Sequence, residues 1–257
     1  MPTRSSRRSL RPGENDLSLQ SKPSGAEGTP DRGEYVSQFR RHCHQLIAVG
    51  YSRIHAEDHS ESEEDFITQR LKETIRGAQR EGTLPRWADR YFVTDQAPVS
   101  ALRRVGKKRP KIDLEFQSTE SRNRPVYHFE AKRLRRGNSS PGKYLGRDGL
   151  RMFLTELYGL SGNEGGMLGY VQSESPEHWA KKIQGKLERD PKENHRLTDD
   201  GKWIAARLTP ELKYTYATCH HRLTLGNITI YHTLLDFRIR ENQEPNCTAP
   251  PVATTGH

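Results

Sequence analysis

Residues 111–118 read Lys-Ile-Asp-Leu-Glu-Phe-Gln-Ser, and residues 126–134 read Val-Tyr-His-Phe-Glu-Ala-Lys-Arg-Leu. In the first stretch polar and apolar residues alternate, which is typical of a strand with one buried face. That face is expected to hold three apolar side chains, those of Ile112, Leu114 and Phe116. The residues between the two stretches are rich in Ser, Asn and Pro, as turns are. The sequence therefore predicts a β-hairpin.

Two acids and a lysine are expected to meet on this hairpin. Asp113 lies on the polar face of the first strand, and Glu130 and Lys132 are two residues apart on the second, so that both project from the same face. Converging carboxylates form a hard-oxygen site suited to Mg²⁺, with Mn²⁺ as a substitute. Lys132 beside that metal would orient or deprotonate an attacking water, or balance charge on phosphorus. The pattern favours metal-dependent hydrolysis of a phosphodiester over cross-strand ion pairing alone.

Helical and strand periodicities alternate on both sides of the hairpin. Helices are expected at 35–47, with Gly50 as a stop, and at 62–81, 149–160 and 176–187. Further strands are expected at 91–94, 167–171, 213–218 and 227–237. This order predicts an α/β fold with a mixed central sheet flanked by helices. Residues 1–33 are expected to form a disordered basic arm, 34–238 the folded domain and 239–257 a flexible C-terminal tail.

Composition narrows the class of protein. Hydrophobic residues make up 32% of the chain, charged residues 29%, and the mean hydropathy is −0.96, which argues against a membrane-embedded protein. The N-terminus lacks the apolar stretch of a secretory signal, and three cysteines are too few for a disulfide framework. We therefore expect a cytoplasmic protein.

The positive charge of the chain is concentrated near the hairpin. The net charge is +9, and residues 101–151 hold fifteen Lys and Arg against five acids. Such a local positive field favours a polyanionic partner, namely nucleic acid. The residues expected to contact it flank the proposed metal site: Arg109, Lys111, Arg133, Arg135, Lys143, Tyr144, Arg147 and Arg151.

The arrangement of Asp113, sixteen intervening residues and then Glu130-Ala131-Lys132 resembles the PD-(D/E)xK superfamily of restriction endonuclease-like nucleases. The resemblance covers residues 34–238 and implies an αβββαβ core. It also implies that Asp113, Glu130 and the Ala131 carbonyl bind the metal, that Lys132 serves the water, and that a Glu of the preceding helix assists. Glu64 is favoured for this role over its neighbour Glu63. The motif's proline departs from the family pattern, because it lies three residues before the aspartate.

The resemblance implies a Mg²⁺-dependent endonuclease that acts on DNA. It extends to uncharacterised prokaryotic nucleases, some of them found near defence genes, so that a homodimer or a subunit of a defence complex is expected. Two alternatives stay open. In the first, the chain is a nucleic-acid-binding or adaptor module that has the fold but no catalytic activity. In the second, it is a nuclease subunit that stays silent until a partner activates it.

Overall fold

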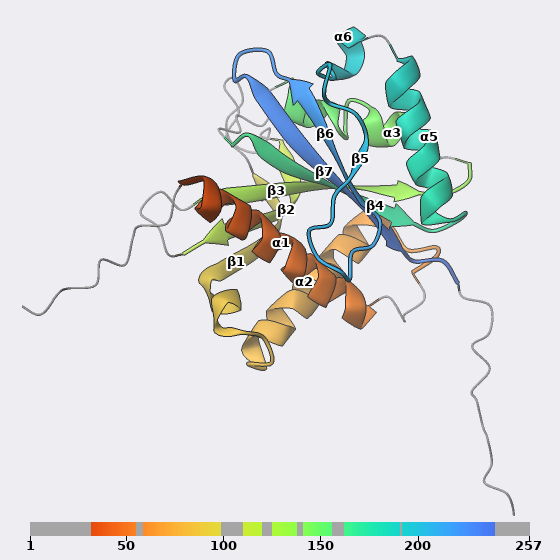
Figure 1. The fold of residues 1–257 in the computed structure, drawn as a ribbon. Helices are drawn as coiled ribbons and strands as arrows, with labels where there is room; N and C mark the ends of the chain where they lie inside the picture. Colours follow the sequence, from red (N-terminus) through yellow and green to blue (C-terminus); the bar gives the residue numbers. More distant parts are fainter. Residues whose placement is uncertain are drawn as a thin grey trace, which may run out of the picture.

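A seven-stranded mixed sheet forms the centre of the protein in the computed structural model (Figure 1). The structure describes residues 32–54, 59–98, 110–119, 125–137, 141–155, 162–190 and 192–239. The expected arm and tail therefore lie outside the described residues, except at their inner ends. There the structure corrects the boundary, because Arg32 and Gly33 already belong to the first helix.

The hairpin predicted from the sequence forms the second and third strands of this sheet. The strands are β1 (Tyr91–Pro98), β2 (Lys111–Ser118), β3 (Val126–Leu134), β4 (Glu164–Val171), β5 (Ile204–Ala205), β6 (Thr215–His221) and β7 (Asn227–Asp236). Their spatial order is β1-β2-β3-β4-β7-β6-β5. Strand β4 runs parallel to both β3 and β7, and the other neighbours are antiparallel. All the expected strands are confirmed, and the short edge strand β5 is an addition.

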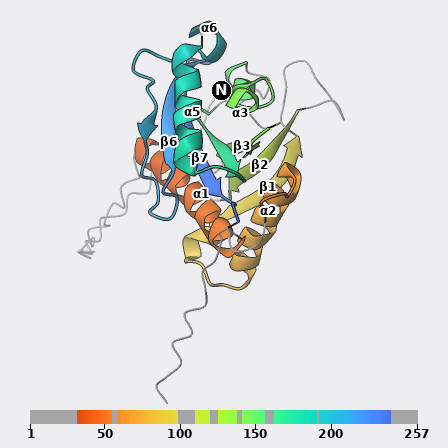
Figure 2. The ribbon, with the colours of Figure 1, turned by 90° about the vertical axis from the view of Figure 1, so that its right-hand side faces the viewer.

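Helices cover both faces of the sheet (Figure 2). They are α1 (Arg32–Ile54), α2 (Glu64–Arg80), a 3₁₀ turn at Arg86–Arg90, α3 (Pro141–Leu145), α4 (Arg151–Leu154), α5 (Pro176–Arg189) and α6 (Lys192–His195). Alternate residues of β4 enter two separate cores. Leu168 and Tyr170 pack with α1 and α2, whereas Met167 and Val171 pack with α3, α4 and α5. This alternation is what a sheet buried on both faces requires.

Two helix predictions are wrong in detail. Helix α1 does not end at Gly50 but continues to Ile54. The glycine lies where α1 crosses α2 closely. A Cβ at Gly50 would come within 2.7 Å of the Leu71 side chain. The helix expected over 149–160 is only the short α4 as far as residue 155, and residues 156–161 lie outside the described part of the chain.

The predicted alternation along β2 is also interrupted. Leu114 and Phe116 pack under α1 and α2 as expected, but Ile112 packs in the core on the other face. The change of face occurs at Asp113, which is itself buried. Among the described residues, no helix has both the length and the apolar character needed to cross a membrane.

Candidate active site

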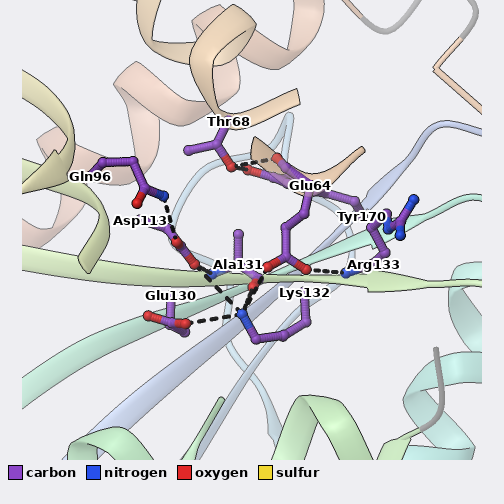
Figure 3. A network of polar contacts seen from close by, with 9 residues as sticks. All are labelled: Glu64, Thr68, Gln96, Asp113, Glu130, Ala131, Lys132, Arg133 and Tyr170. Atoms are coloured by element: carbon purple, nitrogen blue, oxygen red, sulfur yellow. Dashed lines mark hydrogen bonds and ion pairs between the residues drawn. The ribbon is translucent and has the colours of Figure 1, made fainter. Parts of the chain in front are cut away.

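The side chains expected to form a metal site gather around the ammonium group of Lys132 (Figure 3). Its Nζ lies 2.9 Å from Glu64 Oε1 and 3.0 Å from Glu130 Oε1, both within hydrogen-bond distance. It also lies 2.5 Å from the Ala131 carbonyl oxygen and 3.7 Å from Asp113 Oδ2. Strands β2 and β3 and helix α2 thus bring three carboxylates and one carbonyl to a single cation.

Local backbone geometry explains how the carboxylates of Asp113 and Glu64 are held in place. The pairing between β2 and β3 reaches only as far as Leu114 and Phe129. Just beyond it, the backbone N–H of Ala131 donates to Asp113 Oδ2 at 2.8 Å. Two residues further along β3, the N–H of Arg133 donates to Glu64 Oε2 at 3.0 Å. The separation of the two strands therefore frees β3 amides to bind side chains.

Helix α2 is anchored so that its first residue, Glu64, reaches the sheet. The Thr68 hydroxyl, one turn later, donates to the Glu64 carbonyl at 2.9 Å and lies 2.8 Å from the hydroxyl of Tyr170 on β4. Gln172, just after β4, donates to the His59 carbonyl at 2.7 Å and so ties the loop before α2 to the sheet. The carboxylate of Glu64 is positioned by these contacts.

The site is largely shielded from solvent, and its carboxylates hold Lys132 in the charged form. The exposed fractions of the side chains are 7% for Glu130, 12% for Asp113, 14% for Lys132 and 26% for Glu64. Burial by itself lowers the pKa of Lys132, but the charges of Glu130, Asp113 and Glu64 outweigh it and raise the pKa above its ordinary value. Lys132 therefore carries its proton in this arrangement, as the counter-ion of the carboxylates.

The donor set suits a hard cation, although the arrangement as it stands is centred on the ammonium group. In the described part of the chain, no three His, Cys, Asp or Glu side chains are grouped closely enough to hold a metal ion. The oxygens around Lys132 are nevertheless of the kind that Mg²⁺ prefers, and they already converge on one positive charge. A divalent ion would fit among them only if the lysine side chain moved aside.

Of the two neighbouring glutamates, the structure brings Glu64 to the site and keeps Glu63 away from it. Glu63 is exposed and pairs with the Arg133 guanidinium at 2.8 Å. His128, which lies on β3 two residues before Glu130, pairs across the hairpin with Glu115 at 3.1 Å.

The basic residues expected to bind nucleic acid are placed in different ways. Four of them are exposed at the start of β2 and around α3 and α4: Lys111, Lys143, Arg147 and Arg151. Arg133 and Arg135 are partly exposed and form ion pairs with Glu63 and Glu61 in the loop before α2. Arg109 lies outside the described residues.

Tyr144 is a correction to the expected nucleic-acid surface. Its side chain is fully buried in the core beneath α3, and its hydroxyl lies 3.2 Å from Nδ1 of His232. It therefore does not belong to the protein's surface. The charged residues around it in the sequence conceal its packing role.

Gln96 on β1 belongs to the site and was not expected from the sequence. Its side-chain amide donates to Asp113 Oδ1 at 3.1 Å (Figure 3). No local pattern marks this glutamine, because its role depends on a pairing between strands. Thr68, by contrast, follows Glu64 by four residues, and this spacing could have placed it on the same helix face.

Comparisons of this chain with protein-family models, with curated proteins and with solved structures find no match.

Proposed function

We propose that this protein is a Mg²⁺-dependent nuclease that hydrolyses phosphodiester bonds in nucleic acid, with DNA as its substrate. The observation that carries the proposal is the convergence of Glu64, Asp113, Glu130 and the Ala131 carbonyl on one cationic atom. Burying several carboxylates together is costly, and a positive charge at their centre, that of Lys132 or of a metal ion, compensates for that cost.

The order of elements around the site supports the same proposal. Helix α2 precedes three antiparallel strands, β1, β2 and β3, and β4 returns parallel to β3. This is compatible with the αβββαβ core that the sequence resemblance implies. Strands β5, β6 and β7 extend the sheet beyond such a core.

Each side chain has a distinct part in the proposed reaction. Glu64, Asp113, Glu130 and the Ala131 carbonyl would hold the metal, which when bound supplies Lewis acidity and an activated water. Lys132, once a metal takes its place among these oxygens, would lie beside the scissile phosphate and stabilise the charge that develops there. The exposed Lys143, along with other cations near α3 and α4, binds the phosphate backbone.

A plasmid-cleavage assay tests the proposal directly. Purified wild-type protein is incubated with supercoiled plasmid in Mg²⁺, in Mn²⁺ or in EDTA, and the products are resolved on a gel. Nicked or linear product is expected with either metal and none with EDTA. Asp113→Asn is expected to lower the cleavage rate at least about 100-fold, because it removes one charged ligand from the metal site.

Glu115→Gln is the matched control, since Glu115 lies two residues away on the same strand and its carboxylate pairs with His128. This variant should cleave like the wild type. If Asp113→Asn cleaves as fast as the wild type, the proposed metal site is wrong. If the wild type yields no product with either metal, the proposal of a nuclease that is active on its own is wrong, and the two alternatives, a binding module or a subunit activated by a partner, are left. Salt-dependent plasmid binding without cleavage would instead favour a nucleic-acid-binding module.

A further inference from the structure

Gln96 has a backbone conformation that strands do not normally adopt. Three non-glycine residues of the described chain have a positive φ, namely Gln96, Glu174 and Arg196, and Gln96 is the one that lies within a strand. Its φ is 47°, in the left-handed region that is unfavourable for a side chain with a Cβ. Such strain persists only where the surrounding structure enforces it, and it is concentrated at functional sites.

The strained residue lies opposite Asp113 in the sheet. On one side of Gln96 the residue Asp95 pairs with Leu114, and on the other side Ala97 pairs with Ile112. The register is the same on both sides, so that Gln96 faces Asp113 across the β1–β2 pairing. The amide of Gln96 then needs to span only 3.1 Å to reach Asp113 Oδ1.

Both strands change faces at this pair. Val93 on β1 packs in the core under α1 and α2, but Ala97 packs against the core on the opposite face. On β2, Leu114 and Ile112 are divided between the same two cores. In a regular strand, residues separated by an even number of positions share a face. The left-handed backbone conformation at Gln96 thus coincides with the change of buried face on β1. Asp113 lies at the point on β2 where the same change occurs.

Helix α2 holds this twist in place. The Lys72 ammonium lies 2.8 Å from Oδ1 of Asp95, the residue just before Gln96, and both side chains are largely buried. Lys72 is two turns along the same helix that presents Glu64 to the site. Helix α2 therefore positions Glu64, one proposed metal ligand, and also holds β1, the strand whose Gln96 contacts Asp113, a second proposed ligand.

We propose that Gln96 is a positioning residue for Asp113 in the metal site, an inference that rests on the proposed function. The carboxylate of Asp113 accepts from Gln96 at Oδ1 and from the Ala131 N–H at Oδ2, so that neither oxygen is free to rotate (Figure 3). Donors that fix a ligating carboxylate in this way raise the affinity of a metal site, because less orientational freedom is lost on binding. The backbone strain at Gln96 is retained for this alignment.

Mn²⁺ binding and thermal unfolding, measured on the same variants, test this role. Gln96→Gly removes the amide and also relieves the backbone strain, because glycine adopts a positive φ freely. Its melting temperature should equal or exceed that of the wild type, while its Mn²⁺ affinity by calorimetry falls about 10-fold or more. The electron paramagnetic resonance spectrum of bound Mn²⁺ should change in the same variant, because the geometry of one ligand changes.

Two further variants separate positioning from strain and from folding. Gln96→Asn tolerates the left-handed conformation but is one methylene too short to reach Asp113, so it should also bind Mn²⁺ more weakly. Glu174→Gly relieves a similar strain, at φ 56°, outside the site and should leave Mn²⁺ affinity unchanged.

The outcomes distinguish this inference from the proposed function. If the wild type binds Mn²⁺ and both Gln96 variants bind it equally well, the positioning role is wrong and the metal site stands. If affinity falls only in proportion to a loss of thermal stability, Gln96 is a structural residue and the inference is likewise overturned. If the wild type binds no Mn²⁺ at all, the proposed metal site fails, and the role of Gln96 fails with it.

Discussion

Lys132 is the counter-ion of the candidate site. Its ammonium neutralises a group of three carboxylates, two of which have exposed side-chain fractions of 7% and 12%. Buried like charges are tolerated only when an opposite charge compensates them. The residue that we propose for catalysis is therefore also expected to stabilise the fold when no metal is bound.

Lys132→Met should reveal this second role. The substitution keeps an unbranched side chain but leaves the carboxylates of Glu64, Asp113 and Glu130 without their shared cation. We expect the free energy of unfolding at neutral pH to fall by about 3 kcal/mol in EDTA, as measured by urea denaturation. Millimolar Mg²⁺ should restore much of the loss, because an ion that binds only the native state stabilises it.

Lys72→Met is the comparison for that experiment. Lys72 is similarly buried but pairs with a single carboxylate, that of Asp95. Its replacement should cost less stability, and Mg²⁺ should not reverse the loss. Equal losses in the two variants, or a loss in Lys132→Met that Mg²⁺ leaves unchanged, would contradict the idea that the ammonium and a metal share one site.

At the scale of elements, the crossing of α1 and α2 depends on Gly50, which lies four residues before the end of α1. A Cβ at Gly50 would lie 2.7 Å from Leu71 Cδ1 and 2.9 Å from Ile75 Cγ1, both well inside van der Waals contact. Glycine costs an isolated helix up to about 1 kcal/mol relative to alanine, so it is kept here because the helices approach closely.

Gly50→Ala and Gly77→Ala should therefore have opposite effects. The first forces α2 away from α1 and should lower the free energy of unfolding by about 2 kcal/mol despite alanine's higher helix propensity. The second lies within α2, where the nearest atom to an added Cβ is 3.9 Å away, and should raise stability by about 0.5–1 kcal/mol. Urea denaturation of both variants measures the difference, and a destabilised Gly77→Ala would contradict this account of the two glycines.

These elements also show how far sequence patterns reach. The hairpin was predictable because alternating residues from Lys111 onward and a turn-rich connection are local signals, and Glu64 was predictable because it falls on the buried stripe of α2. The spacing of the motif then placed Asp113 beside Glu130.

What the sequence did not reveal depends on contacts between distant segments. A glycine after a helical run resembles a stop, and only the packing of α2 shows that Gly50 allows a close crossing instead. Gln96 has no distinctive neighbours, and its role arises from the register between β1 and β2. Tyr144 lies among charged residues in the sequence but packs inward from a short helix.

At the scale of the whole molecule, a chain of hydrogen bonds through the core determines the protonation state of two histidines, His220 and His232. Nδ1 of His220 donates to the carbonyl of His195 at 2.7 Å, so its Nε2 accepts from the Thr218 hydroxyl at 2.6 Å. That hydroxyl in turn accepts from Nε2 of His232 at 2.8 Å, whose Nδ1 accepts from the Tyr144 hydroxyl. Every contact is satisfied when each imidazole carries one proton. A second proton on either ring would set donor against donor.

Burial reinforces this neutrality and predicts acid sensitivity. It lowers the pKa of His220 to about 4, that of His44 to about 4, and that of His232 well below its ordinary value. Between pH 6.5 and 4 the unfolded chain therefore binds protons that the native state does not, so the free energy of unfolding decreases as the pH falls. Each histidine contributes a slope of up to about 1.4 kcal/mol per pH unit in that window.

Urea denaturation at several pH values from 7 to 4.5 measures this slope. The wild type should lose stability steadily over the range. His44→Gln should show a shallower dependence by up to one proton, since glutamine does not titrate. A wild-type stability that is flat from pH 6.5 to 4.5 would mean that the native state takes up protons as readily as the unfolded chain, and the account of neutral buried imidazoles from Tyr144 to His195 would then be wrong.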